Sequence, residues 1–85
     1  MSFKSFPPKV RAAALALRGL CNEHGFENRF IASELADEAG ISRLSIGRIV
    51  RSSGFVACAL TLGVCVVGVD RYSGYTWIST LRAKQ

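Results

Sequence analysis

The sequence predicts a single α+β domain in which helices come first and an antiparallel β-hairpin or three-stranded sheet comes last. Two observations carry this prediction. Apolar residues recur every three or four positions up to about residue 53, as on one face of a helix, and beyond Gly54 the chain becomes dense in Val, Leu and Cys. With 85 residues, 49% of them hydrophobic and 20% charged, the chain has the composition of one ordered globular domain.

The first helix is expected over about residues 8–24. Pro8 suits its first turn, where no amide donor is needed, and Gly25 suits its end. One face is apolar at helical spacing: Val10, Ala13, Ala14, Leu17, Leu20 and Cys21. Gly19 costs about 1 kcal/mol relative to Ala inside a helix, so we expect it to pack closely against another helix.

Residues 32–51 read as two short helices joined by a tight turn. The first is expected at about 33–39 and stops at Gly40; the second is expected at about 42–53, with Ser42 as its N-cap. Gly54 then reads as a helix stop. The buried stripe of the second helix is formed by Ile46, Ile49 and Val50.

Strands are expected at about 56–60, 64–69 and 75–80, with a polar turn at 70–74. The run 56–69 lacks the alternation of a sheet that has one wet face, which indicates that both faces are covered. So small a domain has few helices for that purpose. We therefore predict a homodimer through these strands, with the first helix as a second possible contact.

The net charge of +5 is unevenly distributed. Residues 1–39 hold five basic and five acidic side chains, whereas residues 40–85 hold six basic side chains and a single acid, Asp70. The whole surplus therefore falls in the second helix of the pair and in the residues after it. Such asymmetry indicates a polyanionic partner.

The cysteines and the single histidine offer little chemistry. Cys21, His24, Cys58 and Cys65 are four possible zinc ligands, but their spacing matches no compact zinc motif, so we predict no metal and no cofactor. Buried, reduced cysteines are the expected alternative. No Ser-His-acid or Cys-His set is suggested, so we expect neither an enzyme nor a small-molecule site.

Neither a signal-like segment nor a membrane span is indicated. The amino terminus is interrupted by lysines and two prolines, and the apolar run 55–69 is shorter than the roughly 20 residues that a spanning helix needs. We expect a cytoplasmic protein of prokaryotic, plasmid or viral type. Phe55, Tyr75 and Trp77 would suit either a base-stacking platform or the core, and the absence of flanking basic residues favours the core.

From about Pro8 to Ser79 the chain resembles the winged helix-turn-helix superfamily of DNA-binding domains, in which three helices precede a β-hairpin. The resemblance lies in a small residue at Ala36, a turn at Gly40, and Ile46 and Ile49 holding the second helix against the first. Leu35, Ala39 and Ile41 fill the remaining inner positions.

The resemblance implies that the second helix of the motif lies in the major groove of double-stranded DNA. Its outward positions would then contact bases and phosphates: Ser42, Arg43, Leu44, Ser45, Gly47, Arg48 and Arg51. Arg43 and Ser45 are the best candidates for base contacts. The hairpin tip, with Arg71 and Tyr72, would be the wing, although the acid at Asp70 is a departure from a basic wing.

The expected function is sequence-specific binding of double-stranded DNA by a small transcriptional repressor or a plasmid- or phage-type DNA-binding adaptor. It would act by occupancy rather than by chemistry. The alternative is a winged-helix protein-protein interaction module, in which the apolar strand region binds a partner protein and the motif is only structural.

Overall fold

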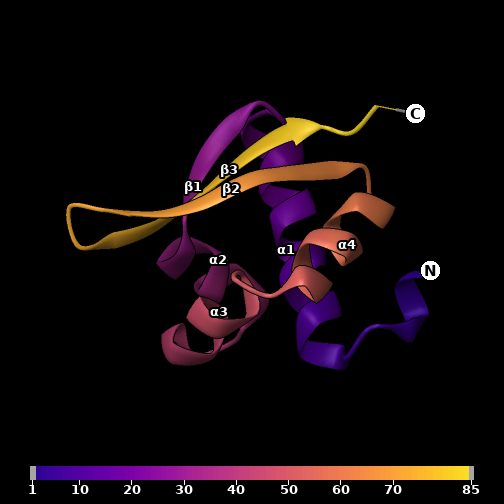
Figure 1. Ribbon diagram of the computed structural model, residues 1–85, viewed down its shortest axis with the longest axis horizontal. Helices are drawn as coiled ribbons and strands as arrows, with labels where there is room; N and C mark the ends of the chain where they lie inside the picture. Colours follow the sequence, from indigo (N-terminus) through magenta and orange to yellow (C-terminus); the bar gives the residue numbers. More distant parts are fainter. Residues whose placement is uncertain (1, 85) are drawn as a thin grey trace.

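The computed structural model describes residues 2–84, which form four α-helices, one short 3₁₀-helix and a three-stranded antiparallel sheet (Figure 1). This confirms the α+β class but gives one helix more than the three expected. In chain order the elements are η1 (Phe3–Ser5), α1 (Pro8–His24), β1 (Asn28–Ile31), α2 (Ala32–Ala39), α3 (Arg43–Ile49), α4 (Ser53–Thr61), β2 (Val64–Tyr72) and β3 (Tyr75–Arg82).

Helix α1 begins at Pro8 and stops at Gly25, as its sequence indicates. The Gly25 N–H donates a hydrogen bond of 2.8 Å to the carbonyl of Cys21, and Gly25 has a φ of 103°, which favours glycine. The expectation for Gly19 is wrong. This glycine is exposed, and a Cβ built on it would meet no atom within 4 Å.

Replacing Gly19 by Ala should therefore stabilise the protein. The helical backbone of α1 suits alanine, the space is open, and alanine loses less conformational freedom on folding. We expect the free energy of unfolding to rise by about 0.5–1 kcal/mol in urea denaturation. A decrease would contradict the open environment of this position.

Two expectations around residue 52 are wrong. The helix expected over 42–53 ends at Ile49, and the strand expected at 56–60 is part of helix α4. Ser52 causes both differences: its hydroxyl donates to the Ile49 carbonyl at 2.6 Å and accepts from the Phe55 N–H at 3.2 Å, so it closes α3 and caps α4. Gly54 is therefore not a helix stop but lies in the first turn of α4.

The third strand of the sheet lies at β1, not at residues 56–60. The strand order is β1-β3-β2, and Phe30 of β1 pairs with Ile78 of β3. Strands β2 and β3 form a hairpin whose turn is only two residues, Ser73 and Gly74, both with positive φ. The turn is thus shorter than the expected 70–74, because residues 70–72 belong to β2 and pair with β3.

All four α-helices lie on one side of the sheet, and the core lies between them and it (Figure 1). Phe55 of α4 is the largest fully buried side chain among the described residues. The one buried polar side chain among them, Thr80, donates to the Phe26 carbonyl at 2.7 Å, which satisfies its hydroxyl. The largest side chains buried with Phe55 are Leu17, Leu35, Ile46 and Ile78.

Candidate nucleic-acid interface

The turn between α2 and α3 fixes the direction of α3. Gly40 adopts a left-handed conformation, with φ 67° and ψ 33°, and the Ile41 N–H donates a hydrogen bond of 3.0 Å to the Ala36 carbonyl. Ser42 then starts α3 by accepting from the Ser45 N–H at 3.2 Å. Ile46, which is 1% exposed, packs this short helix against the core. The side opposite Ile46 is therefore presented to solvent.

The residues expected to face outward on this helix are accessible. Leu44 has 73% of its surface exposed. Ser45 and Gly47 are half-buried. The remaining positions are exposed: Ser42, Arg43, Arg48 and Arg51, the last of which lies two residues beyond the end of α3.

A hollow of about 280 Å³ connects α3 with the hairpin. Arg43 and Gly47 line it from α3, and Tyr75 and Thr76 line it from β3. The start of α2 closes the third side. The full lining is Ile31, Ala32, Ser33, Arg43, Ile46, Gly47, Gly74, Tyr75 and Thr76. Sequence reasoning missed Ser33, Tyr75 and Thr76, because only the β1–β3 pairing brings β3 next to the start of α2.

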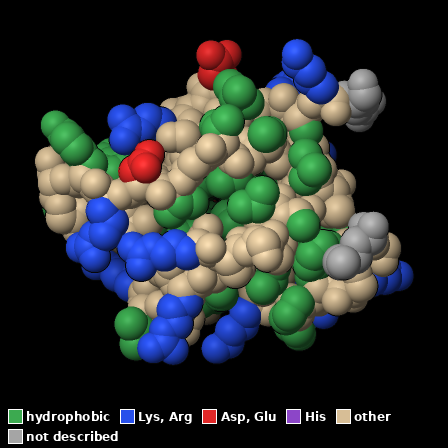
Figure 2. Space-filling view, viewed as in Figure 1, with side chains coloured by type: hydrophobic (Ala, Val, Ile, Leu, Met, Phe, Trp, Pro, Cys, Tyr) green, Lys and Arg blue, Asp and Glu red, His purple; other side chains and the backbone are tan. Residues whose placement is uncertain are grey.

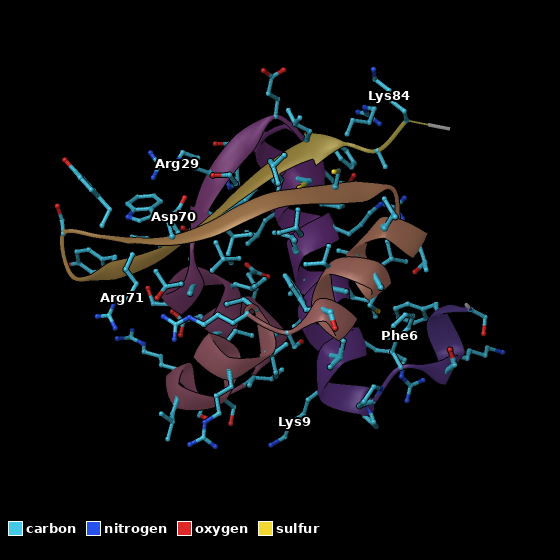
Figure 3. The ribbon with its side chains drawn as sticks, in the orientation of Figure 1. Phe6, Lys9, Arg29, Asp70, Arg71 and Lys84 are labelled. Atoms are coloured by element: carbon cyan, nitrogen blue, oxygen red, sulfur yellow. The ribbon has the colours of Figure 1, made fainter. Side chains whose placement is uncertain are left out.

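Arg71 and its neighbour Asp70 lie on opposite faces of the hairpin. Successive side chains of a strand alternate in direction, and Figure 3 shows Arg71 pointing toward the α2–α3 side while Asp70 points away from it. Asp70 pairs with Trp77, and Arg71 with Thr76, which lines the hollow. The acid therefore does not oppose the basic character of the α3 side. By the same alternation Tyr72 lies on the face of Asp70, apart from Arg71.

The basic side chains are electrostatically uncompensated. Within residues 2–84 the one ion pair joins His24 to Glu23, so none of the arginines there is neutralised by a carboxylate within 4.0 Å. Figure 2 shows Lys and Arg side chains gathered over α3 and the hairpin, and Figure 3 shows Asp70 on the side of the hairpin away from α3. A surface with an excess of positive charge attracts a polyanion and raises its rate of association.

Two of the three cysteines are buried thiols. Cys21 and Cys58 are buried, and Cys65 is half-buried. Burial raises the pKa of the Cys21 thiol, an effect that its hydrogen bond to Thr80 and the charge of Arg82 oppose. Burial also raises the pKa of the Cys58 thiol. Both thiols stay protonated at neutral pH. Among residues 2–84, no group of three or more His, Cys, Asp or Glu side chains is placed to hold a metal ion.

The three aromatic residues weighed as a stacking platform are not on one surface. Phe55 is in the core, Trp77 is half-buried with the Arg29 guanidinium 5.1 Å from its ring centroid, and Tyr75 is exposed at the hairpin tip.

None of the described helices is both long and apolar enough to span a membrane. No family model, curated protein or solved structure matches the chain, so its function is inferred from its own residues.

Proposed function

We propose that this chain is a winged helix-turn-helix protein that binds double-stranded DNA, with α3 in the major groove and the β2–β3 hairpin as the wing. The observation that carries the proposal is the set of exposed arginines, none in an ion pair within residues 2–84, at α3 and on the hairpin: Arg43, Arg48, Arg51 and Arg71. Arg43 also lines the hollow between the two elements. The helix α4, which the resemblance did not include, packs against α1 and leaves the exposed side of α3 free.

The dimensions of α3 suit this role. An α-helix with its side chains is about 10–12 Å in diameter, which fits a major groove about 12 Å wide, and the seven residues of α3 span about 10 Å along it. Arg43, in the first turn, can offer two parallel N–H donors to a guanine edge, and Leu44 can contact a thymine methyl group. Arg48, in the last turn of α3, and Arg51, two residues beyond its end, can reach bases or phosphates.

The biological role that this supports is a small transcriptional repressor or a plasmid- or phage-type adaptor, which acts by occupying its site. Selection of bound sequences from a random duplex pool tests the proposal. We expect a defined sequence of a few base pairs to be enriched at moderate salt. Recovery of duplexes with no common sequence would contradict specific recognition by α3.

Gly47 gives a sharper test of close approach to DNA. A Cβ at Gly47 would meet no atom of the protein within 4 Å, so Gly47→Ala should stabilise α3 by up to about 1 kcal/mol. If the DNA backbone or a base edge occupies that space, the same substitution should weaken binding several-fold. Gly19→Ala is the matched control, because it makes the same change of helix propensity at an exposed position of a different helix, α1. Equal affinities for the two variants in a fluorescence anisotropy titration would argue against contact at Gly47.

We also propose a homodimer, but the evidence for it is now the exposed side chains of the sheet and no longer the whole apolar run. Part of the apolar run that suggested it is accounted for by α4, which buries Phe55, Cys58 and Ala59 inside the monomer. Two aliphatic side chains of the sheet are still exposed, Val67 at 58% and Leu81 at 39%. Selected sites that contain two half-sites at fixed spacing, together with a dimer mass in sedimentation equilibrium, would support it.

The alternative function, a protein-interaction module, is favoured by a separate apolar groove. Phe6, Ala57, Leu60 and Thr61 line it, on the side of α4 that faces η1. The affinity of a partner protein for this groove should not change when residues of α3 are substituted. Retention of partner binding by a variant that lacks Arg43 and Arg48 would therefore separate this function from DNA binding.

A further inference from the structure

A second basic hollow lies at the end of the fold opposite the hairpin tip. It is lined by Arg18 of α1, Phe26, the α4–β2 turn and the end of β3, and its volume is about 410 Å³. Figure 1 places this end of β3 near the carboxyl terminus, across the molecule from the Ser73–Gly74 turn. The full lining is Arg18, Phe26, Leu62, Gly63, Arg82 and Ala83. None of these residues is acidic.

The two arginines reach this hollow from elements that are far apart in the sequence. Arg82 is the last residue of β3, and its guanidinium carbon lies 4.0 Å from the centroid of the Phe26 ring. A guanidinium stacked in this way keeps its N–H donors free at the edge. The stack also restricts the rotamers of Arg82, which lowers the entropy lost when a ligand is bound.

A backbone hydrogen bond joins two of the segments that line the hollow. The Ala83 N–H donates to the Gly63 carbonyl at 3.0 Å, and this bond joins the end of β3 to the α4–β2 turn. Gly63 itself has a φ of 84°, a conformation that side chains other than glycine rarely adopt. Neither Arg18 nor Arg82 is neutralised by a carboxylate of residues 2–84. Arg18 and Arg82, which come from α1 and β3, thus both line one hollow with no carboxylate paired to either within residues 2–84.

We propose that Arg18 and Arg82 form an oxyanion site that binds a phosphate group. Planar guanidinium groups match phosphate oxygens with two parallel N–H donors each, and the stack on the Phe26 ring orients the Arg82 guanidinium. The phosphate can belong to a small phosphorylated molecule or to the backbone of a second nucleic-acid segment. This site is distinct from the α3 surface and does not depend on DNA binding there.

Inorganic phosphate is the first probe, added to ¹⁵N-labelled protein at constant ionic strength. We expect saturable shifts of the backbone amides of Leu62, Gly63 and Ala83. Arg18→Ala should weaken the apparent affinity about tenfold or more, since it removes one of two charge-assisted contacts. Lys9→Ala, which removes one exposed charge at the other end of α1 (Figure 3), should leave the affinity unchanged. Shifts that do not saturate, or that persist equally in Arg18→Ala, would overturn the proposal.

A second arm identifies the source of the phosphate. In a variant that carries Arg43→Ala and Arg48→Ala, a short duplex should still shift the amides of Gly63 and Ala83 if the site binds nucleic-acid backbone. If inorganic phosphate shifts them and the duplex does not, the site serves a small phosphorylated molecule. Arg82→Lys keeps the charge but not the planar fork, and it should retain only part of the affinity. Full affinity in Arg82→Lys would contradict the role of the fork.

Discussion

Simultaneous replacement of Arg43 and Arg48 by Ala should abolish sequence-specific binding of duplex DNA. Each good bidentate contact to a base is worth about 1–3 kcal/mol, so the loss of two lowers affinity by about 30-fold to more than 10⁴-fold. Both side chains are exposed and unpaired, so the folded state should keep its stability. Electrophoretic mobility shift with a selected sequence measures the affinity, and urea denaturation checks the fold.

The control must separate specific contact from net charge. Lys4 and Lys84 are both exposed; Lys4 lies on η1, and Figure 3 shows Lys84 at the end of the molecule opposite the hairpin tip. Lys4→Ala with Lys84→Ala removes the same number of positive charges and should change affinity only slightly at physiological salt, where exposed charges are screened beyond about 8 Å. If the two double variants bind equally weakly, charge alone governs binding and α3 is not the recognition element. Where either Arg of α3 contacts a phosphate, its loss should also reduce the salt slope by about 1.

Replacement of Phe55 by Ala should unfold a large fraction of the protein. Phe55 is 0% exposed and anchors α4 in the core. Large-to-small substitutions of a buried phenylalanine cost about 3–5 kcal/mol, which is comparable with the total stability of a small domain. Circular dichroism on heating should show a transition displaced to much lower temperature, or none.

The neighbouring Val56 gives the matched comparison. It lies on the same turn of α4 but is 38% exposed, so Val56→Ala should cost at most about 1 kcal/mol. In a strand the two positions would point to opposite faces; on α4 the next buried residues after Phe55 are Cys58 and Ala59, at helical spacing. A comparable loss of stability for Val56→Ala and Phe55→Ala would contradict the burial pattern of α4.

The sequence predicted α1 and the β2–β3 pairing well because their signals are local. Pro8 and Gly25 bracket a regular apolar period, and the Ser73–Gly74 turn separates two β-prone runs. The strand prediction failed within residues 55–61 because a short apolar run suits a buried strand and a buried helix equally. The signal for a helix is Ser52, which is the N-cap of α4 just as Ser42 is the N-cap of α3. Gly54, two residues later, gives the competing signal of a helix stop.

For the candidate site, the sequence indicated the exposed face of α3 but not its surroundings. Gly40, Ser42 and Ile46 together determine which side of that helix is outward, so a helical pattern is enough to choose it. That Asp70 points away from Arg71 depends on how the hairpin is oriented relative to the helices, and the hollow depends on the pairing of β1 with β3. Neither relation has a local sequence signal, since both are long-range contacts.

The proposed contact of α3 and the hairpin tip with duplex DNA is tested most directly by backbone amide shifts of ¹⁵N-labelled protein on titration with a duplex chosen from the random pool. We predict the largest shifts within residues 42–51, with further shifts within 71–76 on the hairpin. Shifts confined to α4 and the outer face of the sheet, with residues 42–51 unchanged at saturation, would contradict the account.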